Sequence, residues 1–542
     1  MGGRAFLGLA LLLALALRLP HLTESLWYDE LFATDRFLGT GLGLAKTLLT
    51  DIHPPVYPLL MHAWDRVFGD SELSVRLPSL LAGLGSLPLL LAIGRATVGE
   101  HTARLATLLL AASPVHAWYS QEARHYSLVV LFFLAAILAF LRLCEAGERS
   151  ASSDRRWLLL LAVGLFGAAF THYYMAAMAP VIAVLAWWLG ARRRRAITAI
   201  AACLVLAFAA FLAAKGTLSS VPTGMSYLRG FGPAEAWHLV TGWLVTGNAF
   251  APRLAGGFAP PGLAALLELF AAGLLVAGVV VSLRPPAQRC RVLALLLLAL
   301  VLPVSLFTLN LLGFERTYIE RSALPCLPLV LLLLAAGLGR LGPRAGHVML
   351  VVLMATAWLG NTLNREHWTI YKVNPDWRGA AAALGARLDA GDSPASLYSL
   401  YNSPTALSYY DPRLQESKFF EPNEQRMARL RDRLASGMAS VLGEDSGLAD
   451  ALLAEVDTAF ASYDEALDVR RHSMQLEILD HRRERPEARG EQRFWLLVHG
   501  EHGLPGEVAA EGGDFLEPGS GLVVREELRF RSLGLYLVAP ED

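Results

Sequence analysis

Two adjacent carboxylates, Asp29 and Glu30, follow the first apolar stretch of the chain, in segment 24–30 with the sequence ESLWYDE. A carboxylate at a membrane surface can act as a general base that accepts a proton from a hydroxyl group. Burial would raise its pKa, whereas a nearby cation would keep it ionised. The structural alternative is that Asp29 caps a short interfacial helix beside the aromatic anchors Trp27 and Tyr28.

A histidine and a tyrosine flank two prolines in segment 51–57, DIHPPVY. Each proline restricts its own φ, so the pair forms a stiff turn that fixes the directions of His53 and Tyr57. The two side chains are candidate positioning groups. The alternative is a plain turn that leads into the next helix.

A short polar segment, 113–126 with the sequence SPVHAWYSQEARHY, separates two apolar segments. Ionisable side chains at membrane depth are costly unless they are paired or face a wet cavity, so they are candidates for function. The site residues that we select from it are Glu122, Arg124 and Tyr126.

Two further polar clusters stand at helix ends, THYY at 171–174 and ERTYIER at 315–321. The first supplies His172 and Tyr173 as candidate positioning groups, and the second supplies Arg321. A guanidinium can hold two oxygens of a lipid phosphate at once. Pairing between neighbouring Arg and Glu side chains is the alternative.

The elements that must position these groups are membrane helices. The chain of 542 residues is 54% hydrophobic and only 18% charged, which is typical of a protein that lies mostly in lipid. Its net charge of −1 gives no reason to expect nucleic-acid binding. We expect about eleven transmembrane helices, each of roughly 20 apolar residues. Their expected ranges are 5–20, 77–95, 104–119, 126–143, 157–173, 175–190, 196–214, 263–283, 291–312, 322–340 and 346–361.

Arginines fall in alternate connections between these segments, for example at 95 and 104, at 192–195 and at 340 and 344. The bias of Lys and Arg toward cytoplasmic loops predicts a cytoplasmic N-terminus and an external C-terminus. Every polar cluster described above then lies on the external side, including the loop 21–76 with its acidic motif. Lysine occurs only at 46, 215, 372 and 418, a bias typical of a GC-rich bacterial genome, and we expect a multi-pass protein of the bacterial inner membrane. The N-terminal segment is read as an uncleaved helix, because Arg-Leu-Pro-His follows it where small residues should mark cleavage.

Charge density rises after Asn361, and apolar residues gather in short, strand-length runs at 395–401, 494–499 and 522–538. Polar helical patterns separate these runs. The sequence therefore predicts a membrane domain at 1–361 and a small soluble α/β domain at 362–542 outside the membrane. The four cysteines all lie in or beside apolar segments, so we expect neither a disulfide framework nor a CxxC metal site.

The motifs, in their order along about 350 residues, resemble the polyprenyl-phosphate-sugar-dependent glycosyltransferases of the GT-C superfamily. The bacterial branch with the protein O-mannosyltransferases and the lipid A aminoarabinose and galacturonic acid transferases is the most similar. The matching pieces are WYDE at 27–30, HPPVY at 53–57, RLP at 76–78, SQEARHY at 120–126, HY at 172–173, Arg321 with Pro325, and PDWR at 375–378.

The resemblance implies a mainly α, GT-C type bundle that transfers a sugar from an undecaprenyl-phosphate donor, with inversion, to a lipid, glycan or protein acceptor outside the membrane. Asp29 matches the acidic residue of the family's first external loop and would be the general base, with Glu30 orienting the acceptor or Asp29. Arg124 and Arg321, with Tyr126, would stabilise the departing phosphate. His53, Tyr57, Glu122, His172 and Tyr173 would position donor or acceptor. The resemblance implies no definite cofactor; a divalent cation is optional, with His53, Glu122 and His172 as its candidate ligands.

The chain departs from the family pattern at Arg321, which Ser322 follows where a tyrosine is frequent, so that Tyr318 could supply the aromatic contact instead. Two other classes of protein also place charges at helix ends. A transporter or lipid flippase would more often have repeated halves and broken helices, and the sequence has no such repeat. A membrane sensor would need a cytoplasmic output module, but the expected inside loops are all short.

Overall fold

The chain forms two compact units in a computed structural model. The first comprises residues 1–23 and 32–370, and the second comprises residues 24–31 and 371–542. The structure describes residues 2–20, 22–34, 44, 48, 53–145, 150–218, 230–247, 261–312, 318, 320–363, 375–391, 397–399, 403–416, 418–419, 494–499, 522–530 and 533–540. Residues 421–490, a very polar, Glu- and Arg-rich part of the expected α/β domain, lie outside the described residues.

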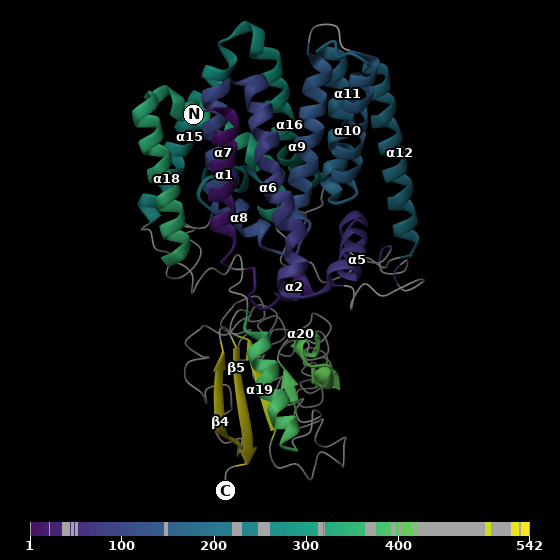
Figure 1. Cartoon of the computed structure of the whole chain (residues 1–542), viewed down its shortest axis with the longest axis vertical. Coiled ribbons are helices and arrows are strands. Elements are labelled where there is room, and N and C mark those ends of the chain that lie inside the picture. Colours follow the sequence, from purple (N-terminus) through teal and green to yellow (C-terminus); the bar gives the residue numbers. More distant parts are fainter. Residues whose placement is uncertain are drawn as a thin grey trace, which may run out of the picture. The chain divides into compact units, whose positions relative to one another are not determined.

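The first unit is helical, and Figure 1 shows its long helices running alongside one another. The α-helices are α1 (Gly3–Arg18), α5 (Val56–Phe68), α6 (Glu72–Thr97), α7 (Glu100–Ala112), α8 (Pro114–Ser120), α9 (Tyr126–Cys144), α10 (Ala151–Ala169), α11 (Met178–Trp188), α12 (Arg194–Leu218), α13 (Pro233–Trp237), α14 (Leu244–Thr246), α15 (Pro261–Leu283), α16 (Pro286–Leu311), α17 (Leu327–Leu338) and α18 (Pro343–Leu363). A π-helix, η2 (His238–Trp243), joins α13 to α14. The 3₁₀ turns among the described residues of this unit are η1 (Tyr173–Ala177), η3 (Glu320–Cys326) and η4 (Gly339–Leu341).

Each apolar segment expected to cross the membrane is helical in the structure. Among the described residues, 6 helices are both long and apolar enough to span a bilayer, and two shorter apolar helices accompany them. The protein is a multi-pass membrane protein. The expected count of about eleven crossings stays a prediction.

The segment expected as one helix at 104–119 consists of two helices. Proline lacks the N–H that an interior helical position needs, so α7 ends at Ala112 and α8 begins at Pro114. Ser113 lies between them in extended conformation, and its side chain accepts a hydrogen bond from the backbone N–H of His116 at 3.3 Å. The break leads the chain into the polar turn 121–125.

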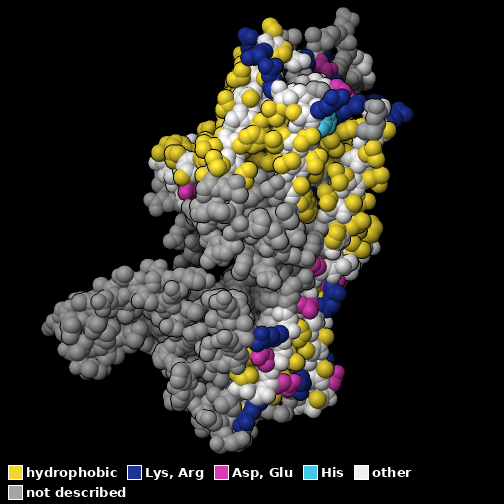
Figure 2. All heavy atoms as spheres, turned by 90° about the vertical axis from the view of Figure 1, so that its left-hand side faces the viewer, with side chains coloured by type: hydrophobic (Ala, Val, Ile, Leu, Met, Phe, Trp, Pro, Cys, Tyr) yellow, Lys and Arg dark blue, Asp and Glu magenta, His cyan; other side chains and the backbone are white. Residues whose placement is uncertain are grey.

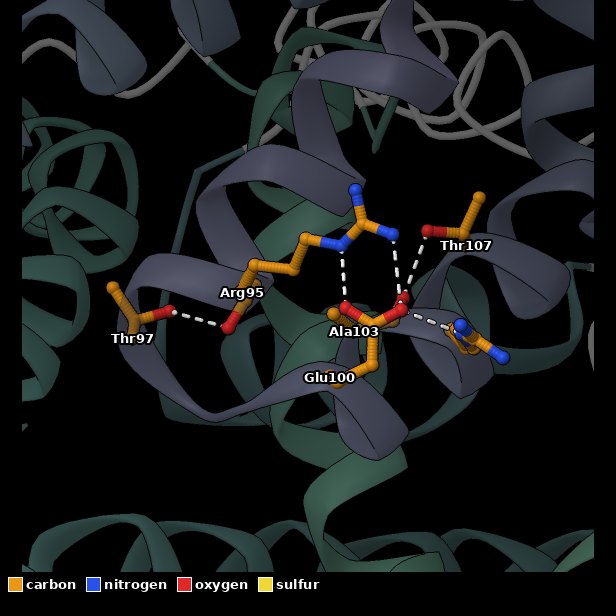
Figure 3. A network of polar contacts seen from close by, with 7 residues as sticks. Arg95, Thr97, Glu100, Ala103 and Thr107 are labelled. Atoms are coloured by element: carbon orange, nitrogen blue, oxygen red, sulfur yellow. Dashed lines mark hydrogen bonds and ion pairs between the residues drawn. The ribbon is translucent and has the colours of Figure 1, made fainter. Parts of the chain in front are cut away.

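Apolar side chains cover the flank of the helical unit, and arginine side chains gather at its upper end in Figure 2. The turn between α6 and α7 shows how these arginines are held (Figure 3). Arg95 donates to both carboxylate oxygens of Glu100, at 2.5 and 2.9 Å, and Arg104 donates to the same group at 2.6 Å. Hydrogen bonds from Arg95 and Arg104 lower the pKa of Glu100 to about 2, so this cluster keeps a net positive charge.

Helices α15 and α17 touch backbone to backbone through two glycines. A Cβ atom at Gly278 would overlap the carbonyl oxygen of Leu333, and one at Gly337 would overlap the carbonyl oxygen of Leu274. Small residues allow this close approach between helices in membranes, where dispersion contacts replace the hydrophobic effect. Because α17 directly follows η3, this close helix packing also fixes the position of η3, the turn that contains Arg321.

We expect Gly278→Ala to destabilise the helical unit by about 1–3 kcal/mol, because the added methyl group meets a backbone carbonyl that cannot rotate away. Gly273→Ala is the matched control on the same helix, since a Cβ there has no atom within 4 Å. Thermal unfolding of both variants in detergent measures the effect. Equal midpoints for the two would contradict the backbone contact.

The second unit contains a five-stranded sheet with the order β2-β1-β3-β5-β4. Its strands are β1 (Leu397–Ser399), β2 (Lys418–Phe419), β3 (Phe494–His499), β4 (Leu522–Phe530) and β5 (Leu533–Pro540). β1 pairs in parallel with β2 and β3, whereas β5 pairs antiparallel with β3 and β4. The helices that the structure describes in this unit are α2 (Tyr28–Leu31), α19 (Trp377–Asp389), α20 (Ser403–Tyr410) and the 3₁₀ turn η8 (Pro412–Glu416). Arg387 joins α19 to the sheet through an ion pair with Glu526 and a contact over the Trp495 ring.

Candidate functional site

The Pro-Pro turn is fixed to the end of α10 by one backbone hydrogen bond. The N–H of Val56, the first residue of α5, donates to the carbonyl oxygen of Phe170 at 3.0 Å. Phe170 is the C-cap of α10, so His172 lies just beyond that helix. The bond therefore brings His53 and His172 to the same place, although they are far apart in the sequence.

The polar turn 121–125 is held by two neighbouring helices. Ser79 of α6 donates to the carbonyl oxygen of Arg124 at 2.9 Å, and the side-chain amide of Gln121 donates to the carbonyl oxygen of Arg18 at 2.8 Å. Arg18 is itself fully buried at the end of α1 and donates to His116 Nδ1 at 2.8 Å. Arg18 and His116 therefore hold α1 against α8, which is a structural use of both residues. The turn is left rigid, with Arg124 only 9% exposed.

Arg124 and His53 contact each other directly, at 3.0 Å between the Arg124 guanidinium and His53 Nε2. Arginine has donors only, so Nε2 of His53 must be the acceptor. His53 is therefore the tautomer with its proton on Nδ1. The contact orients the guanidinium with a neutral partner, which leaves its positive charge uncompensated by this bond.

His125 lies at the centre of a ring of polar and aromatic side chains. Its ring centroid is 4.9 Å from that of His53, 5.5 Å from that of His172 and 6.2 Å from that of Tyr57. Burial, and then its neighbours His53, Arg124, His172 and Arg321, hold the pKa of His125 well below its ordinary value of 6.5. Burial also lowers the pKa of His172 to about 3, with His53 adding to the shift. Both imidazoles are neutral at physiological pH, so the arginines carry the positive charge here.

Arg321 joins the same group of side chains through Tyr126. Its guanidinium carbon lies 5.8 Å from the Tyr126 ring centroid, and the Tyr126 and His125 rings are 4.3 Å apart. Tyr119 supports Tyr126 at 4.9 Å, and Trp243 of the π-helix lies 6.4 Å from Tyr119. We call this group the arginine–histidine cluster; its members are His53, Tyr57, Arg124, His125, Tyr126, His172 and Arg321.

Most of the residues expected to bind donor phosphate or to position substrate thus come together in one unit. His125, at the centre of the cluster, is one that we did not select from the sequence. Tyr173 follows His172, and its ring contacts Phe208 at 6.1 Å. Glu122 contributes its carbonyl oxygen, which accepts from the N–H of Arg124 at 2.7 Å. Tyr318 is buried against Phe231, with ring centroids 4.7 Å apart.

The two carboxylates belong to the second unit. Asp29 is half-buried in the single turn of α2. Glu30 is 1% exposed, and its Oε2 accepts the backbone N–H of Trp27 at 2.8 Å, which closes the first turn of α2. The helix cap considered for Asp29 is therefore supplied by Glu30, and the carboxylate of Asp29 remains a candidate for chemistry.

A divalent cation needs several converging ligands of the right type. Within the part of the chain that the structure describes, no group of three or more His, Cys, Asp or Glu side chains has such an arrangement. His53, one of the expected ligands, instead faces the positive charge of Arg124. The four cysteines are free thiols.

The sequence resembles known proteins over part of its length. A family model described as dolichyl-phosphate-mannose-protein mannosyltransferase matches residues 52–215, a range that includes His53, Arg124, His125 and His172. "Putative mannosyltransferase YycA" of Bacillus subtilis (strain 168) is 31% identical over 140 residues, which cover 26% of this chain and 19% of that relative. The matched segment thus spans about a fifth of the curated relative.

The fold matches over nearly the whole length. A crystal structure of ArnT from Cupriavidus metallidurans bound to undecaprenyl phosphate has a TM-score of 0.50 at 13% identity, and its apo structure has 0.51 at 12%. Each alignment covers 98% of this chain and 97% of the other. Together with the family model, these matches confirm the expected resemblance to the GT-C superfamily glycosyltransferases.

Proposed function

We propose that the chain is an integral membrane glycosyltransferase that moves a sugar from an undecaprenyl-phosphate donor to an acceptor on the external face. The observation that carries this proposal is the arginine–histidine cluster, in which Arg124 and Arg321 stand beside neutral histidines at the ends of membrane helices. Such a cluster suits the phosphate of a lipid, because two guanidiniums supply charge and paired donors. The ArnT structure bound to undecaprenyl phosphate supports the same class of donor.

In the proposed reaction, the Asp29 carboxylate accepts the proton of the acceptor hydroxyl group. The acceptor oxygen then bonds to the anomeric carbon, and the bond from that carbon to the phosphate oxygen breaks. The leaving undecaprenyl phosphate takes the bonding electrons, and attack from the opposite side inverts the anomeric centre. Arg124 and Arg321 stabilise the charge that develops on the phosphate, while His53, Tyr57 and His172 hold the donor in place.

Comparative mass spectrometry of envelope lipids and glycans from wild-type and deletion strains tests this function. We expect one glycan or lipid to lose the mass of a single sugar in the deletion strain. The donor is then tested by adding the corresponding undecaprenyl-phosphate sugar to purified protein. An unchanged envelope, together with protein-dependent movement of a lipid across vesicle membranes, would favour a flippase instead.

The proposal requires the C-terminal unit to lie outside the cytoplasm. Reporter fusions at Gly190, between α11 and α12, and at Asp542 should report opposite compartments, because Arg192–Arg195 mark the Gly190 connection as cytoplasmic. Alkaline phosphatase and fluorescent protein fusions at both sites measure this. A cytoplasmic signal at Asp542 would refute the orientation.

A further inference from the structure

The acidic segment 24–31 follows α1 in the sequence but forms one compact unit with residues 371–542. Ser25, Leu26, Trp27 and Leu31 are each at most 4% exposed. The segment is thus an integral part of the C-terminal unit.

Specific hydrogen bonds anchor the segment. The Ser25 hydroxyl donates to Asp376 Oδ1 and accepts from the backbone N–H of Arg378, both at 3.3 Å. The Leu26 N–H donates to the Tyr410 hydroxyl at 2.8 Å. The same Asp376 oxygen caps α19 by accepting from the N–H of Gly379 at 3.0 Å. The segment is therefore bound to the start of α19 and to the end of α20.

These anchors lie immediately before Asp29 in the sequence. Leu26 is held by Tyr410, and the next N–H, that of Trp27, is held by Glu30 across the turn. The backbone just before Asp29 is consequently held by the Leu26 bond, the bond from Trp27 to Glu30 spans Asp29, and the Asp29 side chain is only half-buried. A catalytic group must be held to within about 0.5 Å of its working position.

We propose that the C-terminal unit positions the general base: Ser25, Asp376 and Tyr410 are positioning residues that set the location of Asp29. This inference rests on the proposed function for the role of Asp29. The C-terminal unit would then contribute to sugar transfer by holding Asp29, whether or not it contacts the acceptor.

The variants Tyr410→Phe and Ser25→Ala, and the two combined, remove the anchors without removing the capping carboxylate of Asp376. Displacement of a reacting group by about 1 Å costs on the order of 10²-fold in rate. We expect the double variant to lower kcat by roughly 10- to 100-fold with the donor KM unchanged, because the arginine–histidine cluster belongs to the other unit. Hydrogen exchange should accelerate in residues 24–31 and stay unchanged in α9. Ser25→Thr keeps the hydroxyl, so its kcat and its hydrogen exchange in residues 24–31 should lie closer to the wild-type values than those of Ser25→Ala.

Asp389→Asn is the matched control, since it removes an exposed ion pair with Arg413 in the same unit without touching the segment. The inference is overturned if exchange in 24–31 does not change in the double variant, or if exchange accelerates while kcat stays at the wild-type value. Failure of the proposed function looks different. In that case the wild-type protein itself transfers no sugar from any undecaprenyl-phosphate donor, and the exchange experiment still decides whether the C-terminal unit anchors the segment.

Discussion

Asp29→Asn is expected to lower the rate of sugar transfer by about 10²–10⁴-fold, the usual cost of removing a general base. The amide has nearly the same volume as the carboxylate but does not accept the acceptor proton at neutral pH. Because the cap of α2 is made by Glu30, the turn should survive the substitution. Single-turnover transfer from a supplied undecaprenyl-phosphate sugar measures the effect on purified protein.

Donor binding and folded yield should remain close to those of the wild type, since the arginine–histidine cluster is unchanged. Asp29→Glu keeps the carboxylate and should retain part of the activity. Glu30→Ala gives a useful contrast, because it removes the cap and should lower thermal stability as well as turnover. Wild-type turnover in Asp29→Asn would show that the carboxylate is not the base.

The sequence was a good guide to the helices because their length and composition are dictated by the bilayer. It was a weaker guide to where they break. The segment 104–119 has the composition of one apolar helix, but Pro114 divides it into α7 and α8. Helix α8 then leads into the turn that contains Arg124. A proline at such a position is a signal that hydropathy averaged over a window does not register.

The members of the cluster were largely predictable, whereas its centre was not. His53 precedes a stiff Pro-Pro turn, and Arg124, His172 and Arg321 are polar residues at the ends of apolar segments, so the sequence indicates all four. His125 has the same property, but adjacent residues on one turn point in different directions. The bond between Val56 and Phe170, 114 positions apart, brings the segments of His53 and His172 together, and the ring distances place His125 beside both histidines.

The association of segment 24–31 with the C-terminal unit could not be predicted from the sequence at all. The contacts that create it join residues separated by 351 and 384 positions. Nothing in the sequence around Ser25, Leu26 or Tyr410 indicates which groups they bond to. In the sequence, the PDWR motif at 375–378 indicates only a resemblance; the fold shows that it caps α19 and binds Ser25.

The second large effect is expected at the two arginines of the cluster. Arg124→Ala and Arg321→Ala should each weaken donor binding by roughly 10- to 150-fold, because a hydrogen bond to a charged group contributes about 1.5–3 kcal/mol. Turnover should fall as well, since charge on the phosphate increases as the sugar leaves. Binding of an undecaprenyl-phosphate analogue and single-turnover rates measure the two effects separately.

Arg289→Ala is the matched control, since this exposed arginine lies in the first turn of α16, outside the cluster, and its side chain donates to the carbonyl oxygen of Leu283. It should bind donor as the wild type does. Arg→Lys at 124 or 321 keeps the charge but loses the planar fork, so donor binding should fall partway. In Arg124→Lys the loss should be larger, because the guanidinium contact that fixes His53 is lost too.

Whether the variants lose thermal stability or donor binding decides between a structural role and a phosphate site for these arginines. Arginines that only stabilise helix ends would give lower yield and a lower unfolding temperature, with normal kinetics in the protein that survives. Arginines that hold the phosphate would give normal unfolding and defective donor binding, with acceptor affinity preserved. If both variants fold stably and bind donor normally, the phosphate site lies elsewhere, and His53 and His172 become the next residues to replace.

Because the imidazole of His172 is neutral, a phosphate held there would depend on single hydrogen bonds, and its binding would fall little with added salt. Strong salt dependence of donor binding in the wild type would therefore favour the two arginines.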